Sequence, residues 1–296
     1  MTAARVLQSS AALIRDTVMS WLDDYAPSMG AALAYYTLFS IAPLSLIVIA
    51  VAGLVFGEQA ARDAIVEQLR LLMGPDGARA VEALLVSVNH RGGGIVATLS
   101  GVAVLLIGAT TVFAELQDAM DRIWRAPRTS GGGLWLLLRT RLLSLGMILG
   151  IGFLLIVSLV ASAALAAFGR WWGPLFGDAR TLASVLDFAL SFATVTTAFA
   201  MIYKWLPRVQ LHWNDVWIGA VVTALLFTVG KSLIGTYLGN SGISSAFGAA
   251  GSLVAVVAWV YYSAQVFLLG VEFTHLYARR YGSLREATEP RRGPGR

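Results

Sequence analysis

The sequence contains no cysteine, which excludes disulfide frameworks, thiolate metal sites and cysteine nucleophiles. Charged residues are also scarce, at 13% of 296 residues, against roughly a quarter in ordinary soluble domains. The three histidines (His90, His212 and His275) lack the spacing of a metal site. Gly92–Gly94 is not followed by the Lys-Ser/Thr pair of a P-loop. We therefore expect neither an enzyme nor a bound cofactor or metal.

Apolar residues, in contrast, make up 57% of the chain, and the mean hydropathy is +0.71. About 20 consecutive apolar residues suffice for a helix to cross a bilayer. Six segments have this character: Ala31–Phe56, Ile95–Ala114, Leu142–Phe168, Leu182–Tyr203, Val216–Leu238 and Ser244–Thr274. The pattern predicts an all-α polytopic membrane protein with six transmembrane helices within residues 29–281, followed by a basic, disordered tail over residues 282–296.

The distribution of Lys and Arg predicts the orientation of these helices. If residues 1–28 are cytoplasmic, the inside segments carry 15 basic residues and the outside loops carry six. Cytoplasmic loops are normally enriched in Lys and Arg, so both termini are expected in the cytoplasm. The net charge of +5 is then explained by these loops and does not require a nucleic-acid partner.

Two regions outside the spans have helical periodicity. In the N-terminal segment, one face collects Ile14, Val18, Trp21, Leu22 and Tyr25, which predicts a short amphipathic helix that either lies on the membrane or packs under the bundle. In the first outer loop, two apolar stripes flank Gly74–Gly77. That Gly-Pro-Asp-Gly sequence predicts two short amphipathic helices with a break between them.

Polar residues inside the spans are the main candidates for function, because the bilayer makes each of them costly. Ser184, Asp187, Ser191 and Thr194 are spaced by three, four and three residues, which places them on one face of the fourth span. Lys231 lies in the fifth span. At about 1.5 Å per residue, Asp187 and Lys231 lie at similar depths in the outer half of the membrane. A substrate path through these five residues, a purely structural Lys–Asp pair and a Lys231 side chain that snorkels to the outer interface are all compatible with the sequence.

Three further residues are assigned to the same hypothetical path. Pro43 interrupts the first span beside Tyr36, and it should kink the helix because proline removes a backbone hydrogen bond. Gln265 supplies an amide within the last span. The kink either shapes the path or is a static bend.

A second polar group is predicted at the cytoplasmic interface. Glu272 lies 29 residues beyond Ile243, roughly 44 Å along a continuous helix, so it cannot reach Lys231. We expect it near Lys204, Arg208 or the cytoplasmic extension of the second span, which carries Gln117 and Asp121.

Five stretches of the chain resemble the YihY / virulence factor BrkB family of bacterial inner-membrane proteins, some of which have been labelled ribonuclease BN-like. They are GAALAYYTLFSIAPL (Gly30–Leu44), Ala109–Trp124, YKWLP (Tyr203–Pro207), GAAGSL (Gly248–Leu253) and WVYYSAQVFLLGVEFT (Trp259–Thr274). Phe247 departs from the pattern, since members often have Tyr there. The resemblance implies a six-helix, multi-pass protein of the bacterial inner membrane that moves lipids or other amphiphiles or supports envelope integrity.

Three functions are weighed against one another. The leading hypothesis is a transporter or flippase-like protein for an anionic amphiphile, with membrane lipids as its partners. The alternative is a non-transporting envelope scaffold that binds envelope proteins. A ribonuclease is disfavoured because a phosphodiesterase of that type needs a His/Asp metal cluster, which the sequence lacks. The oligomeric state is left open by the sequence.

Overall fold

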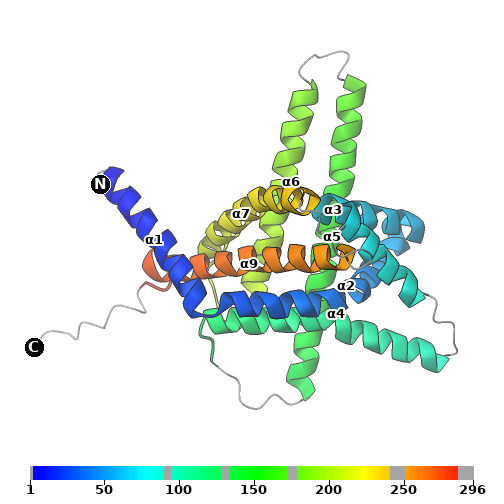
Figure 1. Ribbon diagram of the computed structural model, residues 1–296, viewed down its shortest axis with the longest axis horizontal. Coiled ribbons are helices and arrows are strands. Elements are labelled where there is room, and N and C mark those ends of the chain that lie inside the picture. Colours follow the sequence, from blue (N-terminus) through cyan, green and yellow to red (C-terminus); the bar gives the residue numbers. More distant parts are fainter. Residues whose placement is uncertain (1–2, 90–94, 128–133, 173–178, 241–250, 286–296) are drawn as a thin grey trace, which may run out of the picture.

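The computed structural model describes residues 3–89, 95–127, 134–172, 179–240 and 251–285, which form helices and no strands (Figure 1). The helices are α1 (Ala3–Asp23), α2 (Ala26–Phe56), α3 (Glu58–Asn89), α4 (Ile95–Ile123), α5 (Leu134–Trp172), α6 (Ala179–Trp205), α7 (Trp213–Asn240) and α9 (Gly251–Arg280). The all-α prediction is confirmed for this part of the chain.

Helix α9 lies at the centre of the molecule and contacts α1, α2, α3, α4 and α7. Figure 1 shows it running alongside α2 and α4, with α7 on its other side, while α5 and α6 cross these helices as a pair. The C-terminal end of α9 and helix α1 lie at the same end of the molecule (Figure 1).

Small residues allow α7 and α9 to approach closely. A Cβ atom on Gly219 of α7 would overlap Thr274 of α9, and a Cβ on Gly270 of α9 would overlap Thr223 of α7. At the second contact the Tyr203 and Thr223 hydroxyls share a buried hydrogen bond of 2.8 Å. Close backbone approach through small residues, reinforced by hydroxyl hydrogen bonds, is the usual packing of helices in membranes.

Four helical segments in the described residues are long and apolar enough to cross a membrane: Leu142–Ala167, Leu182–Trp205, Trp213–Tyr237 and Leu253–Arg280. The parts Ala26–Ile41 and Leu44–Leu54, which are bent by 44° relative to each other, add a fifth candidate if they are counted as one span, so the described residues give four or five of the six predicted spans. The kink predicted at Pro43 is therefore confirmed. Residues of the second predicted span, Ile95–Ala114, form the first part of α4.

The α5–α6 pair carries large apolar side chains on its surface. Phe153, Val157, Leu182, Val185 and Phe188 are all 46% exposed or more. In water such a surface would have to be covered, since contiguous exposed apolar patches are rare on soluble proteins. This surface agrees with a helix pair that faces lipid.

The predicted break in the outer loop is wrong, because α3 continues through Pro75 as one helix of 32 residues. Proline inside a helix costs about 3 kcal/mol. Ala61, Ala78 and Val81 of α3 are buried, and α3 packs along both α2 and α9. The burial of apolar surface on both sides of Pro75 therefore outweighs the lost hydrogen bond.

Helix α1 packs on the bundle, as one of the two alternatives from the sequence predicted. Leu13 and Thr17 are buried where α1 packs on the bundle. The apolar side chains of Ile14, Val18 and Leu22 are at least 42% exposed, and they form a stripe at helical spacing beside the packed face. The helix is thus attached to α9 and still presents an apolar surface.

The close α7–α9 contact leads to a prediction about stability. Gly219→Ala should lower the unfolding free energy by about 1–3 kcal/mol, because the new methyl group must displace Thr274. The measurement is the thermal midpoint of the purified protein in mild detergent.

Gly235→Ala is the matched control, since no heavy atom of the described residues lies within 4 Å of the position its Cβ would take. The thermal midpoint of the control should equal that of the wild type or lie slightly above it, because Ala favours the helix more than Gly does. Equal midpoints for the two variants would contradict the packing argument.

Candidate functional site

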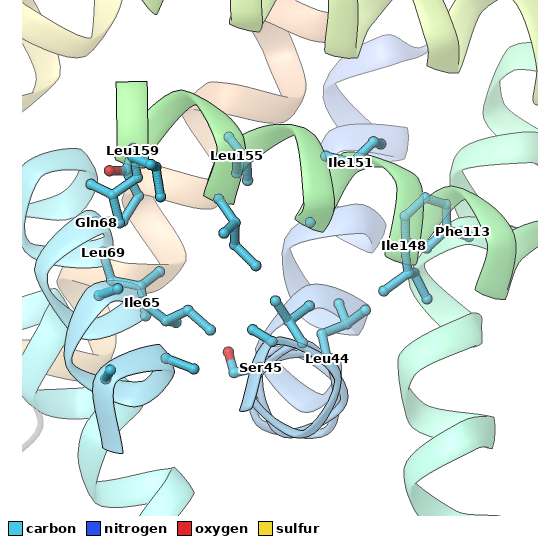
Figure 2. A pocket seen from close by; sticks show the side chains of 18 residues that line it. Leu44, Ser45, Ile65, Gln68, Leu69, Phe113, Ile148, Ile151, Leu155 and Leu159 are labelled. Carbon is cyan, nitrogen blue, oxygen red and sulfur yellow. The ribbon is translucent and has the colours of Figure 1, made fainter. Parts of the chain in front are cut away.

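An apolar cavity of about 430 Å³ lies between α2, α3 and α5, with Phe113 of α4 at one end (Figure 2). It is lined by Leu44, Ser45, Val48, Ala52, Ala60, Ala61, Ala64, Ile65, Gln68, Leu69, Phe113, Ile148, Ile151, Gly152, Leu155, Ile156, Leu159 and Val160. Ser45 and Gln68 are the two polar side chains in this set. Its volume falls in the range of small-molecule sites, and its lining suits an acyl chain or another apolar group.

The bend in α2 lies beside this cavity. Leu44 and Ser45, which line it, directly follow Pro43. Just before the bend, the Ser40 hydroxyl donates a hydrogen bond to the carbonyl of Gly108 on α4. The bend and this interhelical bond together set the direction of the half of α2 that forms the cavity wall.

None of the predicted substrate-path residues is among the described side chains that line the cavity. Lys231 is exposed on α7 and Asp187 is half-buried on α6. No ion pair joins them among those of the described residues. The Asp187 Oδ1 atom is buried and has no hydrogen-bond partner in that part of the chain.

The polar face of α6 is used at least in part for helix packing. Thr194 is buried, and its hydroxyl donates to the Ser158 hydroxyl of α5 at 2.9 Å. Ser191 is half-buried and Ser184 is exposed. The Thr194–Ser158 bond explains one of the four polar residues as a contact between α5 and α6.

Gln265 and Tyr36 are the remaining two path residues. Gln265 lies at the contact between α2 and α9, and Tyr36 lies beside Tyr35 on α2. Gln265 of α9 directs its amide nitrogen at the carbonyl of Pro27, 3.4 Å away, in space that Gly30 leaves open. The Gln265 Oε1 atom is buried without a partner among the described residues. Tyr36 is half-buried, and its ring packs edge-on against that of Tyr35.

Glu272 is completely buried, at the end of the molecule where α1 meets α9. The Ser20 hydroxyl of α1 donates to Glu272 Oε2 at 2.9 Å, and Asp24 and Arg125 lie within electrostatic range. Of the three neighbours expected for Glu272, the extension of the second span is the one it has, through Arg125, whereas Lys204 and Arg208 have other partners. Lys204 donates to the Leu211 carbonyl, and Arg208 pairs with Asp121.

Gln117 and Asp121 attach the end of α4 to the connection between α6 and α7. Gln117 Nε2 donates to the Leu206 carbonyl at 2.8 Å. Asp121 Oδ1 accepts from the Arg208 backbone N–H at 2.9 Å, and its other oxygen lies 3.3 Å from the Arg208 guanidinium. Burial raises the pKa of the Asp121 carboxyl, while both Arg208 contacts oppose the rise. The two residues hold the polar end of the bundle together.

Three exposed tryptophans mark the same end of the bundle. Trp205, Trp213 and Trp217 are between 43% and 51% exposed, and the Trp213 ring lies 6.1 Å and 6.5 Å from the other two. Lys204 Nζ lies 5.3 Å from the centre of the Trp213 ring. Tryptophans with an adjacent cation are typical of the membrane–water interface.

Sequence reasoning missed several residues of this end. Ser20 belongs to α1 and Asp24 directly follows this helix, whose sequence gave no sign of contacting Glu272. His275 follows Glu272 by three residues and stacks on Trp124 at 5.0 Å between ring centres. The spacing of Glu272 and His275 on one helical face was the available signal. Among the described residues, no group of three or more potential ligands could hold a metal ion.

Comparison with known proteins gives a consistent assignment. The family model described as "Virulence factor BrkB" matches residues 17–294. A "UPF0761 membrane protein" of Pseudomonas aeruginosa (strain LESB58) is 28% identical over 253 residues, which cover 84% of this chain and 59% of that protein. A relative of the same description from Stenotrophomonas maltophilia (strain R551-3) is 26% identical, over 86% of this chain and 58% of that protein. One from Tolumonas auensis is 30% identical, over 60% of this chain and 56% of that protein. The chain thus spans less than two thirds of their length. No solved structure matches.

The Ser20–Glu272 bond predicts how α1 is held. Ser20→Ala should lower the unfolding free energy by about 1–3 kcal/mol, because it leaves a buried carboxylate oxygen without its donor. The substitution should also speed the exchange of the α1 backbone amides with deuterium, which hydrogen–deuterium exchange mass spectrometry of α1 peptides would measure. Ser28→Ala, at an exposed serine, is the control. Unchanged exchange in both variants would show that α1 is held by apolar packing alone.

Proposed function

This chain belongs to the virulence factor BrkB family, and on that premise we propose that it moves a lipid or other anionic amphiphile across the bacterial inner membrane. Its relatives are named membrane proteins, and several of its helices are long and apolar enough to span a bilayer. It is therefore a multi-pass membrane protein, and the transported substrate is the proposed part.

The apolar cavity is the observation that carries this proposal. An amphiphile that crosses a membrane must keep its chain in apolar surroundings, since each CH₂ group exposed to water costs about 0.8 kcal/mol. Of the 18 residues that line the cavity, 16 have no polar side-chain group. Two of its walls belong to α2 and α5, whose segments are candidate spans. Such a cavity can hold the chain while leaving the headgroup outside it.

The polar residues of the spans keep their proposed role on the headgroup side of the path. Lys231 is an exposed cation on α7, and a lysine can present a compact charge to a phosphate or carboxylate. Asp187 has an unpartnered buried oxygen within the described residues. Neither lies in the apolar cavity, so their contribution to transport is a separate element of the proposal.

The proposed topology has six transmembrane helices with both termini in the cytoplasm. The bias of 15 basic residues inside against six outside supports it. The exposed Trp205, Trp213 and Trp217 support a membrane–water interface at the α6–α7 connection, and the charge bias assigns it to the cytoplasmic side. The exposed stripe of α1 would then lie in the headgroup layer on the same side. In this proposal the protein is not an enzyme, and an envelope scaffold is the outcome if no transport occurs.

Filling the apolar cavity should stop transport. In proteoliposomes, Ala64→Trp should slow the transbilayer movement of a fluorescent anionic phospholipid by about tenfold or more, since tenfold needs a barrier only about 1.4 kcal/mol higher. Leu225→Trp is the control, because Leu225 is 56% exposed on α7 and does not line the cavity. Lys231→Ala and Asp187→Ala, measured in the same assay, test the headgroup residues separately. Wild-type protein that moves no lipid above empty liposomes would favour the scaffold.

The absence of native cysteine makes the topology directly testable. A single cysteine at Asp63 on α3 should react with a membrane-impermeant maleimide added to cells whose outer membrane is permeabilised and whose inner membrane is intact. A single cysteine at Arg285 should react only after the inner membrane is opened. Both positions are exposed. Labelling of Arg285→Cys in intact cells would contradict a cytoplasmic C-terminus.

A further inference from the structure

A second cavity, of about 450 Å³, lies at the polar end of the bundle and differs in character from the apolar one. We call it the arginine pocket. Its walls come from the two residues that follow α4 (Trp124 and Arg125), the α6–α7 connection (residues 209–211), and the last turns of α9 (His275 and Arg279) together with Leu284 beyond α9. These three regions are far apart in the sequence, so the pocket exists only in the folded chain.

Two guanidinium groups line this pocket without a carboxylate partner. Among the ion pairs of the described residues, Arg208 is held by Asp121 and Arg280 by Asp16, whereas Arg125 and Arg279 take part in none. Both unpaired arginines are exposed, and both act electrostatically on His275. Asp24 and Glu272 act electrostatically on the same end of the bundle, and Glu272 interacts weakly with Arg125 but forms no ion pair with either arginine. The pocket therefore carries two guanidinium charges that no ion pair among the described residues neutralises.

The aromatic wall of the pocket contains two polar groups that are not satisfied. Trp124 is 7% exposed and His275 is 6% exposed. The Trp124 Nε1 and His275 Nδ1 atoms are buried and have no hydrogen-bond partner in the described part of the chain. Buried polar groups are normally hydrogen-bonded, and exceptions require an explanation. Both rings line the arginine pocket, so its aromatic wall holds buried hydrogen-bonding groups that the described residues leave unused.

The backbone places Arg125 in the pocket. Arg125 has φ = 50°, and Ala126 N–H donates to the Asp121 carbonyl at 2.8 Å to close α4. This left-handed position after a helix is normally taken by glycine or asparagine. An arginine is unfavourable there, but the turn fixes its side chain at the pocket wall.

From this geometry we infer that the arginine pocket binds a phosphate group at the membrane surface, presented by an anionic lipid headgroup or by a soluble phosphate. Two guanidinium groups match the oxygens of a phosphate through charge-assisted, bidentate hydrogen bonds. The α6–α7 connection that forms one wall runs between Trp205 and Trp213, which are typical of the headgroup layer. Binding here does not depend on transport, because the pocket shares no residue with the apolar cavity.

The test is isothermal titration calorimetry of the full-length protein in a neutral detergent. Three probes are titrated: inorganic phosphate, a short-chain phosphatidic acid, and a diacylglycerol of the same chain length that lacks the phosphate. Phosphatidic acid should bind and diacylglycerol should not. Binding of inorganic phosphate as well would show that the phosphate alone is recognised, and binding of phosphatidic acid alone would identify a lipid headgroup. Binding of inorganic phosphate alone, with no binding of phosphatidic acid, would identify a soluble ligand. Each of these three binding patterns supports a phosphate site in the pocket.

Variants locate the binding. Arg125→Gln and Arg279→Gln should each weaken it by about tenfold or more, and Arg125→Lys should retain part of it. Arg280→Gln is the matched control, since Arg280 has the same charge at the same helix end but pairs with Asp16 outside the pocket. Native-like melting of each variant is confirmed first. Absence of binding by both phosphate probes, or binding that Arg125→Gln and Arg279→Gln leave unchanged, would overturn the inference.

Discussion

The close contact of α9 with its neighbours is the constraint on which the rest of the structure depends. Because lipid chains are as apolar as leucine, helices in a membrane gain little from apolar burial alone and must pack closely to associate. Gly219 and Gly270 allow that approach between α7 and α9, and Gly30 allows it between α2 and α9. With α9 fixed in this way, α1, α3 and α4 each obtain a surface to pack on.

The same central helix accounts for the polar end of the bundle. Glu272, Thr274 and His275 are buried polar residues within one turn of α9. A buried polar group is costly unless it is hydrogen-bonded. The Ser20 hydroxyl of α1 donates that bond to Glu272. The attachment of α1 is thus linked to the burial of a single carboxyl group.

Two cavities of similar volume differ in chemical character within one chain. The apolar cavity lies among α2, α3 and α5, beside the bend in α2. The arginine pocket lies where α4, the α6–α7 connection and α9 end, so its walls are rich in side chains near helix termini. The proposed transport of an amphiphile needs an apolar environment for chains, and the inferred phosphate site needs a cationic one. The two proposals thus rest on separate parts of the structure.

The sequence by itself determined the helical class, the membrane character, the bend at Pro43 and the family. These follow from local composition and from motifs, and composition along one chain directly reflects the solvent around each helix. The tertiary structure decided which polar residues meet. Lys231 and Asp187 were expected at similar depth, but depth leaves the rotation and neighbours of each helix undefined, and the two side chains form no ion pair in the described structure. The Ser20–Glu272 bond joins residues 252 apart, and α3 passes through Pro75 because of its packing partners. Contacts of this kind depend on how helices are packed, which periodicity within one segment does not encode.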